Sequence, residues 1–292
     1  MTVQYIDRYS GDYKHESIYF EGMMKFLFTT APGQILFEHF LGKRPFSQFY
    51  GSSKDSRRSA AEIPEFIETH DINMSEFVDE NYKTFNDFFI RKFKEGARSF
   101  GSNPKHLSAP CEGRYLGIQE MTPETKVPVK GRFLNPVGLL DNVGLGEQFM
   151  GGPMLISRLA PIDYHRFHFP CEGKILDKYD ISGDLFSVNP LCLKWKEDTF
   201  LRNYRRIHLF DTPHFGKLAY IQVGAFCVGK IEQTWKETFF SKGDELGYFL
   251  FGGSTVILLG EPGKWTIDED ILLGTSEGTE TFIKLGDRVA KC

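Results

Sequence analysis

The sequence lacks any long hydrophobic run. Of its 292 residues, 41% are hydrophobic and 25% are charged, which is ordinary for a soluble globular protein. No apolar run reaches the ~18–20 residues that a membrane-spanning helix needs. The first residues, Met1 to Arg8, lack the charged and apolar regions of a secretory signal. We therefore expect one large globular domain or two modest ones, with no spanning helix and no secretory signal.

A basic excess and paired cysteines are also missing. The formal net charge of −4 argues against a nucleic-acid-binding protein, which usually carries a strong basic excess. The five cysteines are odd in number, scattered and without a CxxC pair: Cys111, Cys171, Cys192, Cys227 and Cys292. This pattern favours free thiols in a reducing compartment over disulfides or a zinc site, and we expect no metal.

Phenylalanine, by contrast, is abundant. The 28 phenylalanines must line either a large core or an apolar contact surface. In Glu16–Phe28 and Gly33–Phe40, aromatic residues recur at three- and four-residue spacing, which predicts helices. Thr84–Asp87 is typical of a capping box, opening a helix that runs through Phe88, Phe89 and Phe93.

These features predict a helical region over residues 1–100. The region is locally basic through Lys25, Lys43, Arg44, Lys54, Arg57, Arg58, Arg91, Lys92 and Lys94. A basic, aromatic, helical segment suits a surface that lies in the lipid interface. We expect the contact around Met23 to Tyr50, with apolar insertion offered by Phe26, Phe28, Phe37, Phe40, Phe46 and Phe49. Helices that pack on the rest of the protein, with solvated lysines, explain the same pattern equally well.

From about residue 105 the pattern changes to short apolar runs divided by Gly, Pro and Asp, which predicts a β-rich domain over residues 101–292. Ala109–Leu116 is echoed by Phe169–Leu176, and Lys242–Gly247 by Lys284–Val289. The Gly-Asp turns are similar to those of biotinyl/lipoyl-type domains, although a repeated turn in unrelated hairpins would give the same echo. The expected fold class is therefore α+β, with a helical membrane-associating segment followed by a mainly antiparallel β domain of paired, lipoyl/hammerhead-like half-barrels.

The run Leu250–Leu259 predicts a buried strand, because it is almost wholly apolar and rich in Val, Ile and Leu. Its entry holds Gly253 and Ser254. A serine directly after a glycine can place its hydroxyl against the preceding carbonyl and attack the peptide bond of its own chain. Taken alone, the same letters also describe a hairpin turn that leads into a strand.

A second stretch, Ser157–Pro170, carries His165 and His168. If the stretch is a strand, we expect both imidazoles on one face, serving one pocket. Histidine takes and gives protons near neutral pH, which suits general acid–base catalysis. Half of a metal site, or two surface histidines, would give the same pair.

Further motifs join these two. In order along the chain they are Phe85–Phe89, Asp163–Pro170, Gly183–Asn189, Val223–Ala225 and Gly253–Val256. This ordered set resembles the phosphatidylserine decarboxylase family over most of residues 84–260. The absence of a spanning run resembles the shorter bacterial forms.

The resemblance implies a self-processing pyruvoyl enzyme. In the family, the serine attacks the carbonyl of the preceding glycine, here Gly253. The resulting ester eliminates to dehydroalanine, which is hydrolysed to a covalent pyruvoyl cofactor on the new chain that begins at Ser254. That group forms a Schiff base with the substrate and accepts the electrons released with carbon dioxide. The resemblance makes His168 the base for self-cleavage and His165 the proton donor to the substrate carbon.

The chain departs from the family at the acid that orients the base. The family has aspartate in a Pro-x-Asp-Gly motif, whereas this chain reads Pro110-Cys111-Glu112-Gly113. We expect Glu112 to serve with a shifted backbone. Asp163 or Asp184 could instead substitute, self-cleavage could be slow, or Glu112 could be a solvent-facing turn residue.

The resemblance further implies phosphatidylserine as substrate, and a peripheral position on the cytoplasmic side of the cell membrane. It also implies a heterodimer of large and small chains from one precursor, which could dimerise again. Two alternatives remain. One is a Ser-His-Glu lipid hydrolase, against which the missing Gly-x-Ser-x-Gly elbow counts. The other is a catalytically weakened or non-catalytic phospholipid-binding module.

Overall fold

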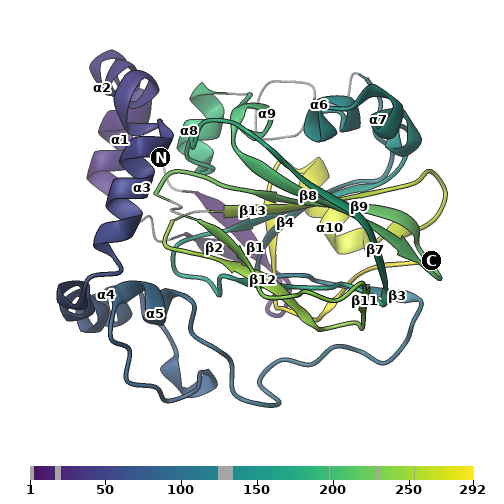
Figure 1. Cartoon of the computed structure of the whole chain (residues 1–292), viewed down its shortest axis with the longest axis horizontal. Coiled ribbons are helices and arrows are strands. Elements are labelled where there is room, and N and C mark those ends of the chain that lie inside the picture. Colours follow the sequence, from purple (N-terminus) through teal and green to yellow (C-terminus); the bar gives the residue numbers. More distant parts are fainter. Residues whose placement is uncertain (1–2, 17–20, 124–133, 197, 228–229, 253) are drawn as a thin grey trace.

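The computed structural model describes residues 3–16, 21–123, 134–196, 198–227, 230–252 and 254–292. They form a mixed α+β fold in which a large, mostly antiparallel sheet is flanked at one end by short helices (Figure 1). The expectation of an α+β chain with extensive antiparallel β structure is confirmed. Of the helices in this part of the chain, none is long and apolar enough to cross a bilayer.

The large sheet contains ten strands. Across the sheet they are β11 (Phe239–Phe240), β7 (Gly173–Ile181), β8 (Arg205–Thr212), β9 (Gly216–Val223), β13 (Ser254–Gly260), β5 (Met154–Leu159), β4 (Gly113–Ile118), β15 (Glu280–Ile283), β1 (Gln4–Asp7) and β2 (Tyr13–His15). β1 runs parallel to β15, and the other neighbours in this sheet are antiparallel.

Two smaller sheets have three strands each. One is ordered β10 (Ile231–Gln233), β12 (Glu245–Phe249), β6 (Arg166–His168); the other is ordered β14 (Thr266–Ile267), β16 (Arg288–Lys291), β3 (His106–Ser108).

The helices are short. They are α1 (Glu21–Thr29), α2 (Ala31–Leu36), a π-helix (Phe37–Leu41), α3 (Arg44–Ser53), a 3₁₀ turn (Arg57–Glu62), α4 (Ile63–Thr69), a 3₁₀ turn (Met74–Glu76), α5 (Phe85–Phe89), α6 (Pro136–Leu140), α7 (Val143–Phe149), α8 (Pro190–Trp195), α9 (Thr199–Arg202) and α10 (Glu269–Ser276). The predicted cap of α5 is confirmed, since the Thr84 side chain accepts a hydrogen bond from the Asp87 amide at 3.0 Å. The helix ends at Phe89, however, and Phe93 pairs with Phe77 as an isolated bridge.

The expectation of helix from the first residues is wrong for residues 4–15. β1 pairs with β15 and β2 pairs with β1, so the amino-terminal segment extends the edge of the large sheet. This pairing joins residues about 275 positions apart in the chain, and a local spacing pattern carries no information about it.

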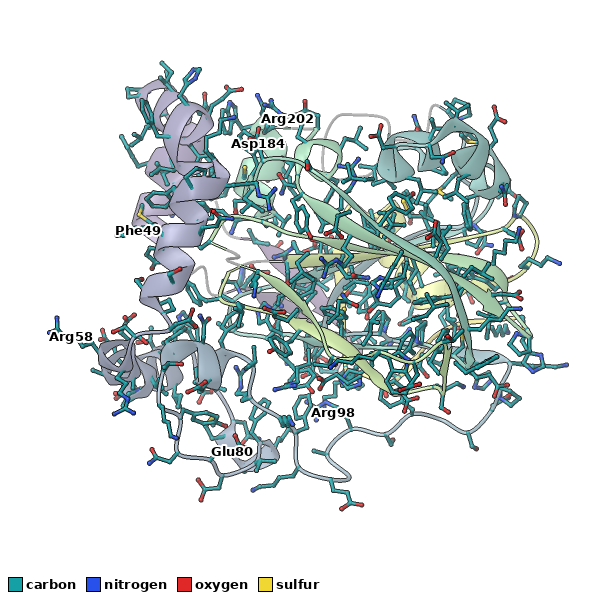
Figure 2. All side chains as sticks on the ribbon, in the orientation of Figure 1. Phe49, Arg58, Glu80, Arg98, Asp184 and Arg202 are labelled. Carbon is teal, nitrogen blue, oxygen red and sulfur yellow. The ribbon has the colours of Figure 1, made fainter. Side chains whose placement is uncertain are left out.

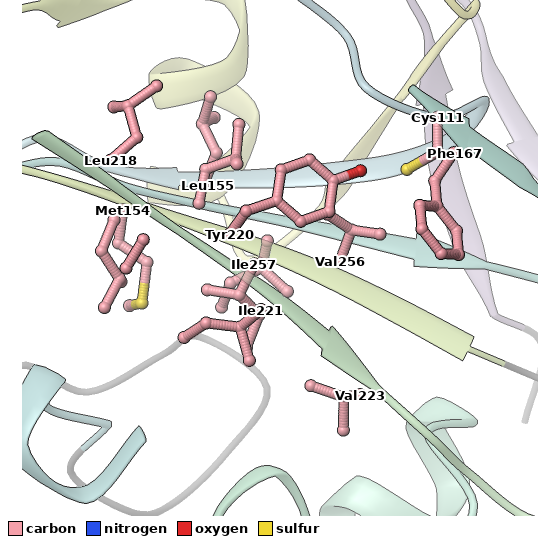
Figure 3. Close-up of a cluster of buried hydrophobic side chains, with 14 of the residues drawn as sticks. Cys111, Met154, Leu155, Phe167, Leu218, Tyr220, Ile221, Val223, Val256 and Ile257 are labelled. Atoms are coloured by element: carbon pink, nitrogen blue, oxygen red, sulfur yellow. The ribbon is translucent and has the colours of Figure 1, made fainter. Parts of the chain in front are cut away.

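The predicted buried strand is confirmed as β13. It lies between β5 and β9, and every one of its residues is buried. Figure 3 shows Val256 and Ile257 packed with Leu155, Tyr220 and Ile221 of the neighbouring strands. A strand covered on both faces reads as a continuous apolar run, which is why the sequence alone identified it.

The internal echo corresponds to two equivalent arrangements of backbone. Ala109 exchanges hydrogen bonds with the Gly286–Asp287 turn at 2.6 and 3.0 Å. Phe169 does the same with the Gly243–Asp244 turn at 2.9 Å for both bonds. Gly243 and Gly286 have φ of 90° and 86°, a left-handed conformation that favours glycine.

The two echoed segments also bind each other directly. The Ser108 amide donates to the Pro170 carbonyl at 2.9 Å, and the His168 amide donates to the Pro110 carbonyl at 2.7 Å. This reciprocal exchange joins the backbones of the two echoed segments side by side.

A cluster of aromatic side chains fills the space between the amino-terminal helices and the sheet. Phe28 and Phe37 are buried in it together with Phe85, Phe89 and Phe251. The expectation that Phe28 and Phe37 offer apolar insertion into a membrane is therefore wrong, because both side chains face the core. Phe26, Phe40 and Phe49 are exposed, with 65% of Phe40 and 77% of Phe49 accessible, and Figure 2 shows Phe49 on the outer side of α3.

Candidate active site

Ser254 opens β13 and is completely buried. Two residues earlier, Gly252 has a φ of 139°, which a side chain would resist. The Phe251 amide donates a hydrogen bond to Asn86 Oδ1 of α5 at 2.9 Å, so the segment entering the strand is held from a distant helix. Gly253, the predicted partner of Ser254 in self-cleavage, lies outside the described residues.

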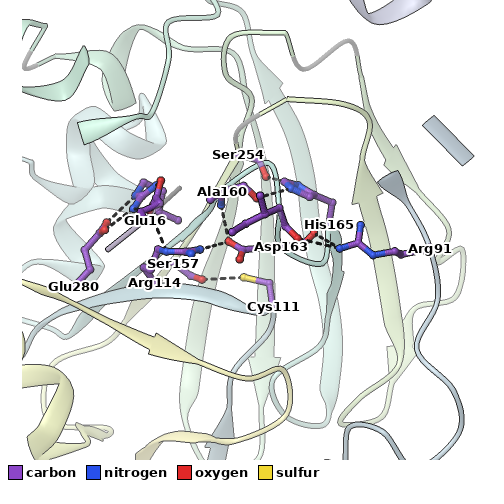
Figure 4. Close-up of polar contacts among 12 residues, drawn as sticks. Glu16, Arg91, Cys111, Arg114, Ser157, Ala160, Asp163, His165, Ser254 and Glu280 are labelled. Atoms are coloured by element: carbon purple, nitrogen blue, oxygen red, sulfur yellow. Dashed lines mark hydrogen bonds and ion pairs between the residues drawn. The ribbon is translucent and has the colours of Figure 1, made fainter. Parts of the chain in front are cut away.

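His165 is the histidine that contacts Ser254. Its Nδ1 lies 3.3 Å from Ser254 Oγ, as Figure 4 shows. The sheet register produces this contact: Ser254 pairs with Leu159 at the end of β5, and the turn from Ala160 to His165 follows directly.

The other ring nitrogen fixes the tautomer of His165. Nε2 lies 2.9 Å from the carbonyl oxygen of Ala160, which can only accept a hydrogen bond. Nε2 therefore carries the proton and Nδ1 presents a lone pair to the Ser254 hydroxyl. Burial lowers the pKa of His165 to about 3, so the imidazole is neutral at physiological pH. This is the state in which a histidine can accept a proton.

His168 has different partners. Its Nδ1 lies 2.9 Å from the Gly243 carbonyl and its Nε2 lies 3.4 Å from the Tyr164 hydroxyl. Burial also lowers the pKa of His168. The expectation that both imidazoles share one face of a strand is wrong, because residues three apart in a strand point to opposite faces and His165 precedes β6.

Glu112 is almost buried, at 9% exposure, and is bound by arginine. Its carboxylate accepts two hydrogen bonds from Arg98, at 2.5 and 2.8 Å, and one from the Leu285 amide at 3.2 Å. Arg98 also binds Glu76, and Figure 2 shows its position below the sheet. These contacts differ from those of a solvent-facing turn residue, and they connect Glu112 to Arg98 rather than to either histidine.

The two acids that could have replaced Glu112 are also engaged elsewhere. Asp163 binds Arg114 and accepts a hydrogen bond from the Ala160 amide at 2.6 Å. Asp184 binds Lys43 at 3.0 Å and Arg202 at 3.2 Å, at the surface near α8 and α9. Of these two, Asp163 belongs to the turn that carries His165, whereas Asp184 lies outside it.

A cavity opens beside Ser254. Gly252, Phe251 and Ala160 form part of its wall, and Gly252 lies two residues before Ser254. The remaining wall is mostly apolar and includes residues of the amino-terminal helices: Met23, Met24, Leu41, Phe46 and Tyr50. Arg158, Glu16, Ser187 and Asn189 supply polar groups. An apolar cavity with a few polar groups suits an amphiphilic ligand.

Three contributors to the site were missed from sequence. The Ala160 carbonyl orients His165, the Phe89 ring stacks on the His165 ring with centroids 4.0 Å apart, and Asn86 holds the Phe251 amide. Asn86 and Phe89 lie in the motif Phe85–Phe89, so the sequence marked these residues as part of the family pattern. It did not indicate what either side chain contacts. The Ala160 carbonyl carried no signal, because any residue supplies a backbone carbonyl.

Known proteins resemble this chain over nearly its whole length. The sequence profile described as phosphatidylserine decarboxylase matches residues 85–290. The phosphatidylserine decarboxylase proenzyme of Clostridium novyi is 38% identical over 280 residues, covering 95% of each chain. The proenzymes of the same name from Fusobacterium nucleatum and Clostridium kluyveri are each 37% identical, and each alignment covers 98% of this chain. The alignments cover 96% of the Fusobacterium nucleatum protein and 98% of the Clostridium kluyveri protein. The chain therefore belongs to the phosphatidylserine decarboxylase family.

Proposed function

We propose that this chain is a self-processing carboxy-lyase, which converts phosphatidylserine to phosphatidylethanolamine through a pyruvoyl group made from Ser254. The observation that carries the proposal is the contact between the buried Ser254 hydroxyl and a neutral imidazole, at the start of a strand preceded by two glycines. Membership of the family supports the substrate and the reaction.

Self-cleavage requires the Ser254 hydroxyl to lose its proton while its oxygen attacks the carbonyl carbon of Gly253. The C–N bond of the peptide breaks and an ester joins the two parts. Loss of the Ser254 α-proton then expels the Gly253 carboxylate from Cβ and leaves dehydroalanine. One water converts its imine tautomer to a pyruvoyl group and releases ammonia.

The described contacts favour His165 as the base that takes the Ser254 proton, because its Nδ1 lone pair already faces Oγ. The resemblance instead gives this step to His168 with Glu112, and reserves His165 for protonating the substrate carbon. For that assignment to hold, His168 must leave the Gly243 carbonyl and Glu112 must leave Arg98. Both assignments place His165 next to the group derived from Ser254.

The surroundings of Ser254 fit a pyruvoyl group. The residue is buried, and an open cavity begins at the neighbouring Gly252 and Phe251. When formed, the group supplies an electron sink for the electrons released with carbon dioxide. The neutral His165 ring lies where it can hold or move a proton at this position.

We further propose that the chain binds membranes peripherally, on the cytoplasmic side of the cell membrane. Met23, Phe26, Ile35, Phe40 and Phe49 are exposed on α1, α2, the π-helix and α3, and residues of α1, the π-helix and α3 also line the cavity. An insoluble lipid could therefore pass from a bilayer into the cavity without crossing water. The nearby charges are partly paired, with Lys25 bound to Glu21 and Lys43 bound to Asp184, so apolar insertion is the larger contribution.

The finer architecture is proposed to be two lipoyl/hammerhead-like half-barrels within a domain of residues 101–292, preceded by a region of residues 1–100. The reciprocal hydrogen bonds between the echoed segments support this duplication. The products of self-cleavage, residues 1–253 and 254–292, would remain joined as a heterodimer, because β13 is paired on both sides with strands of the larger chain.

One experiment tests the proposal. Purified wild-type protein is followed by denaturing gel and intact mass, and phosphatidylserine vesicles are assayed for phosphatidylethanolamine. We expect a fragment of residues 254–292 whose amino terminus is blocked to Edman degradation, and an intact Ser254→Ala chain that forms no product. A chain that stays intact while hydrolysing lipid esters would instead indicate a hydrolase. An intact chain that only binds vesicles would indicate a phospholipid-binding module.

A further inference from the structure

The orientation of His165 depends on a single backbone carbonyl, that of Ala160. This oxygen accepts hydrogen bonds from His165 Nε2 and from the Asp163 amide, each at 2.9 Å. If the carbonyl rotated away, Nε2 would lose its acceptor, and the ring could adopt the other tautomer or turn away from Ser254. Whatever fixes the turn from Ala160 to Asp163 therefore fixes the state of His165.

The Asp163 side chain holds this turn from one side. Its carboxylate accepts the Ala160 amide at 2.6 Å, which closes the turn, and it forms a buried ion pair with Arg114 of β4. Arg114 is itself 2% exposed, so the carboxylate is anchored to the centre of the large sheet.

Arg91 holds the turn from the other side. Its Nη2 donates to the carbonyl of Ile162 at 2.9 Å and to that of Asp163 at 3.2 Å. The guanidinium lies between the rings of Phe77 and Phe88, with centroid distances of 4.5 and 4.8 Å. Figure 4 shows Arg91 and Arg114 reaching Asp163 from opposite sides.

Burial of the Arg91 guanidinium is energetically unfavourable, which indicates that Arg91 has a role other than filling space. The side chain is 2% exposed, and Nε and Nη1 have no hydrogen-bond partner among the described residues. Burying a cation with unsatisfied donors is unfavourable, and the hydrogen bonds that offset this go to the carbonyls of the turn. A methionine of similar length would fill the same space between the two rings without that penalty.

We propose that Arg91 and Asp163 are positioning residues which together hold the Ala160 carbonyl against His165 Nε2, so that the Nδ1 lone pair is presented to Ser254. This inference rests on the proposed function, in which His165 acts on Ser254. It assigns no direct contact with reacting atoms to either residue. We call Arg91 and Asp163 the clamp residues. A displacement of a catalytic group by about 1 Å can cost about a hundredfold in rate, so substitution of either clamp residue should slow self-cleavage measurably.

The test uses two series of variants in the full chain. Arg91→Met removes the donors while keeping an apolar filler, and Arg91→Lys keeps the charge with a different donor geometry. Asp163→Ala removes the acceptor, and Asp163→Asn keeps an oxygen for the Ala160 amide. Asp7→Asn is the matched control, since Asp7 is a buried carboxylate that binds Lys14 and lies outside the ion pairs that anchor Asp163.

Two measurements are made on each variant that folds, as judged by thermal unfolding. The first is the rate of self-cleavage. The second is the side-chain ¹⁵N spectrum of His165 in the Ser254→Ala background, which stays intact and reports the tautomer without any reaction. We expect Arg91→Met and Asp163→Ala to slow cleavage about tenfold to a hundredfold and to shift His165 from the Nε2-protonated form to a mixture. Asp163→Asn should recover part of both, and Asp7→Asn should change neither.

The outcomes separate the two proposals. Clamp variants that cleave at the wild-type rate with an unchanged His165 spectrum would overturn the inference while leaving the proposed function intact. Slow cleavage with an unchanged tautomer would also overturn it, because the effect would then not act through His165. A wild-type chain that never cleaves would refute the proposed function, and the ¹⁵N spectrum would still show whether the clamp sets the tautomer.

Discussion

The phenyl ring of Phe89 stacks on the imidazole of His165, with the ring centroids 4.0 Å apart and an interplanar angle of 25°. Phe89 is fully buried and belongs to α5, which is far from His165 in the chain. The ring shields the imidazole from water, and this burial is the main reason for the lowered pKa of His165.

This contact predicts an unusual pH dependence of self-cleavage. A histidine with a pKa of about 3 is neutral throughout the range from pH 5 to 8, so the wild-type rate should be flat there. Phe89→Leu should admit water, raise the pKa towards the ordinary value of about 6.5, and make the rate fall as the pH drops below that value. Cleavage rates at pH 5, 6, 7 and 8, measured by denaturing gel, check this. Phe85→Leu, on the same helix, is the control, and an inflection near pH 6.5 in the wild type would refute the prediction.

Substitution of His165 and substitution of His168 should affect the rate of self-cleavage differently. Because His165 Nδ1 contacts Ser254 Oγ, His165→Ala should slow cleavage at least a hundredfold, whereas His168→Ala should affect it much less. Time courses of the two variants, purified in parallel, give the answer. If His168→Ala blocks cleavage and His165→Ala only prevents product formation, the assignment taken from the family resemblance holds and the described contact serves the later step.

Glu112 should contribute to stability through Arg98. Glu112→Gln replaces a charge-assisted pair of hydrogen bonds in an almost buried place, and we expect a loss of about 1–3 kcal/mol in the free energy of unfolding. Arg98 would still form its ion pair with Glu76, which limits the loss of stability. Denaturant unfolding of Ser254→Ala chains with and without Glu112→Gln measures the difference in the free energy of unfolding. Cleavage that fell a hundredfold without loss of stability would show instead that Glu112 orients a catalytic histidine.

Membrane binding should depend on the exposed phenylalanines of the amino-terminal helices. Changing Phe26, Phe40 and Phe49 to Ser should weaken co-sedimentation with phosphatidylserine vesicles by about tenfold or more, because each loses apolar area that would otherwise leave water. High salt should weaken wild-type binding only partly, since electrostatic attraction is screened and apolar insertion is not.

The control for this surface comes from the edge of the large sheet that is formed by β11 and β7. Leu176 and Phe239 are exposed on β7 and β11, and changing both to Ser should leave vesicle binding unchanged. An equal loss of vesicle binding in both variants would mean that general surface hydrophobicity drives binding, rather than the exposed phenylalanines of the amino-terminal helices.

The sequence alone determined those features that depend on residues close together in the chain. The apolar run of β13 predicted a buried strand, the Thr84 cap predicted the start of a helix, and the ordered motifs indicated the family. For the strand and the cap the signal lies within about ten consecutive residues, where hydrophobic spacing and capping chemistry decide the structure, and each family motif is equally short.

Only the tertiary structure decided which distant groups meet. The phenylalanines of residues 21–53 share one spacing pattern, yet Phe28 and Phe37 face the aromatic core while Phe40 and Phe49 face outward. The reason is that Phe186, Trp195 of α8 and Phe226 pack against one side of these helices. The register between β5 and β13 brought His165 to Ser254, and the carbonyl that orients His165 comes from an alanine. Strand register and backbone hydrogen bonds join residues through the geometry of the whole fold, so no local pattern of side chains could have specified them.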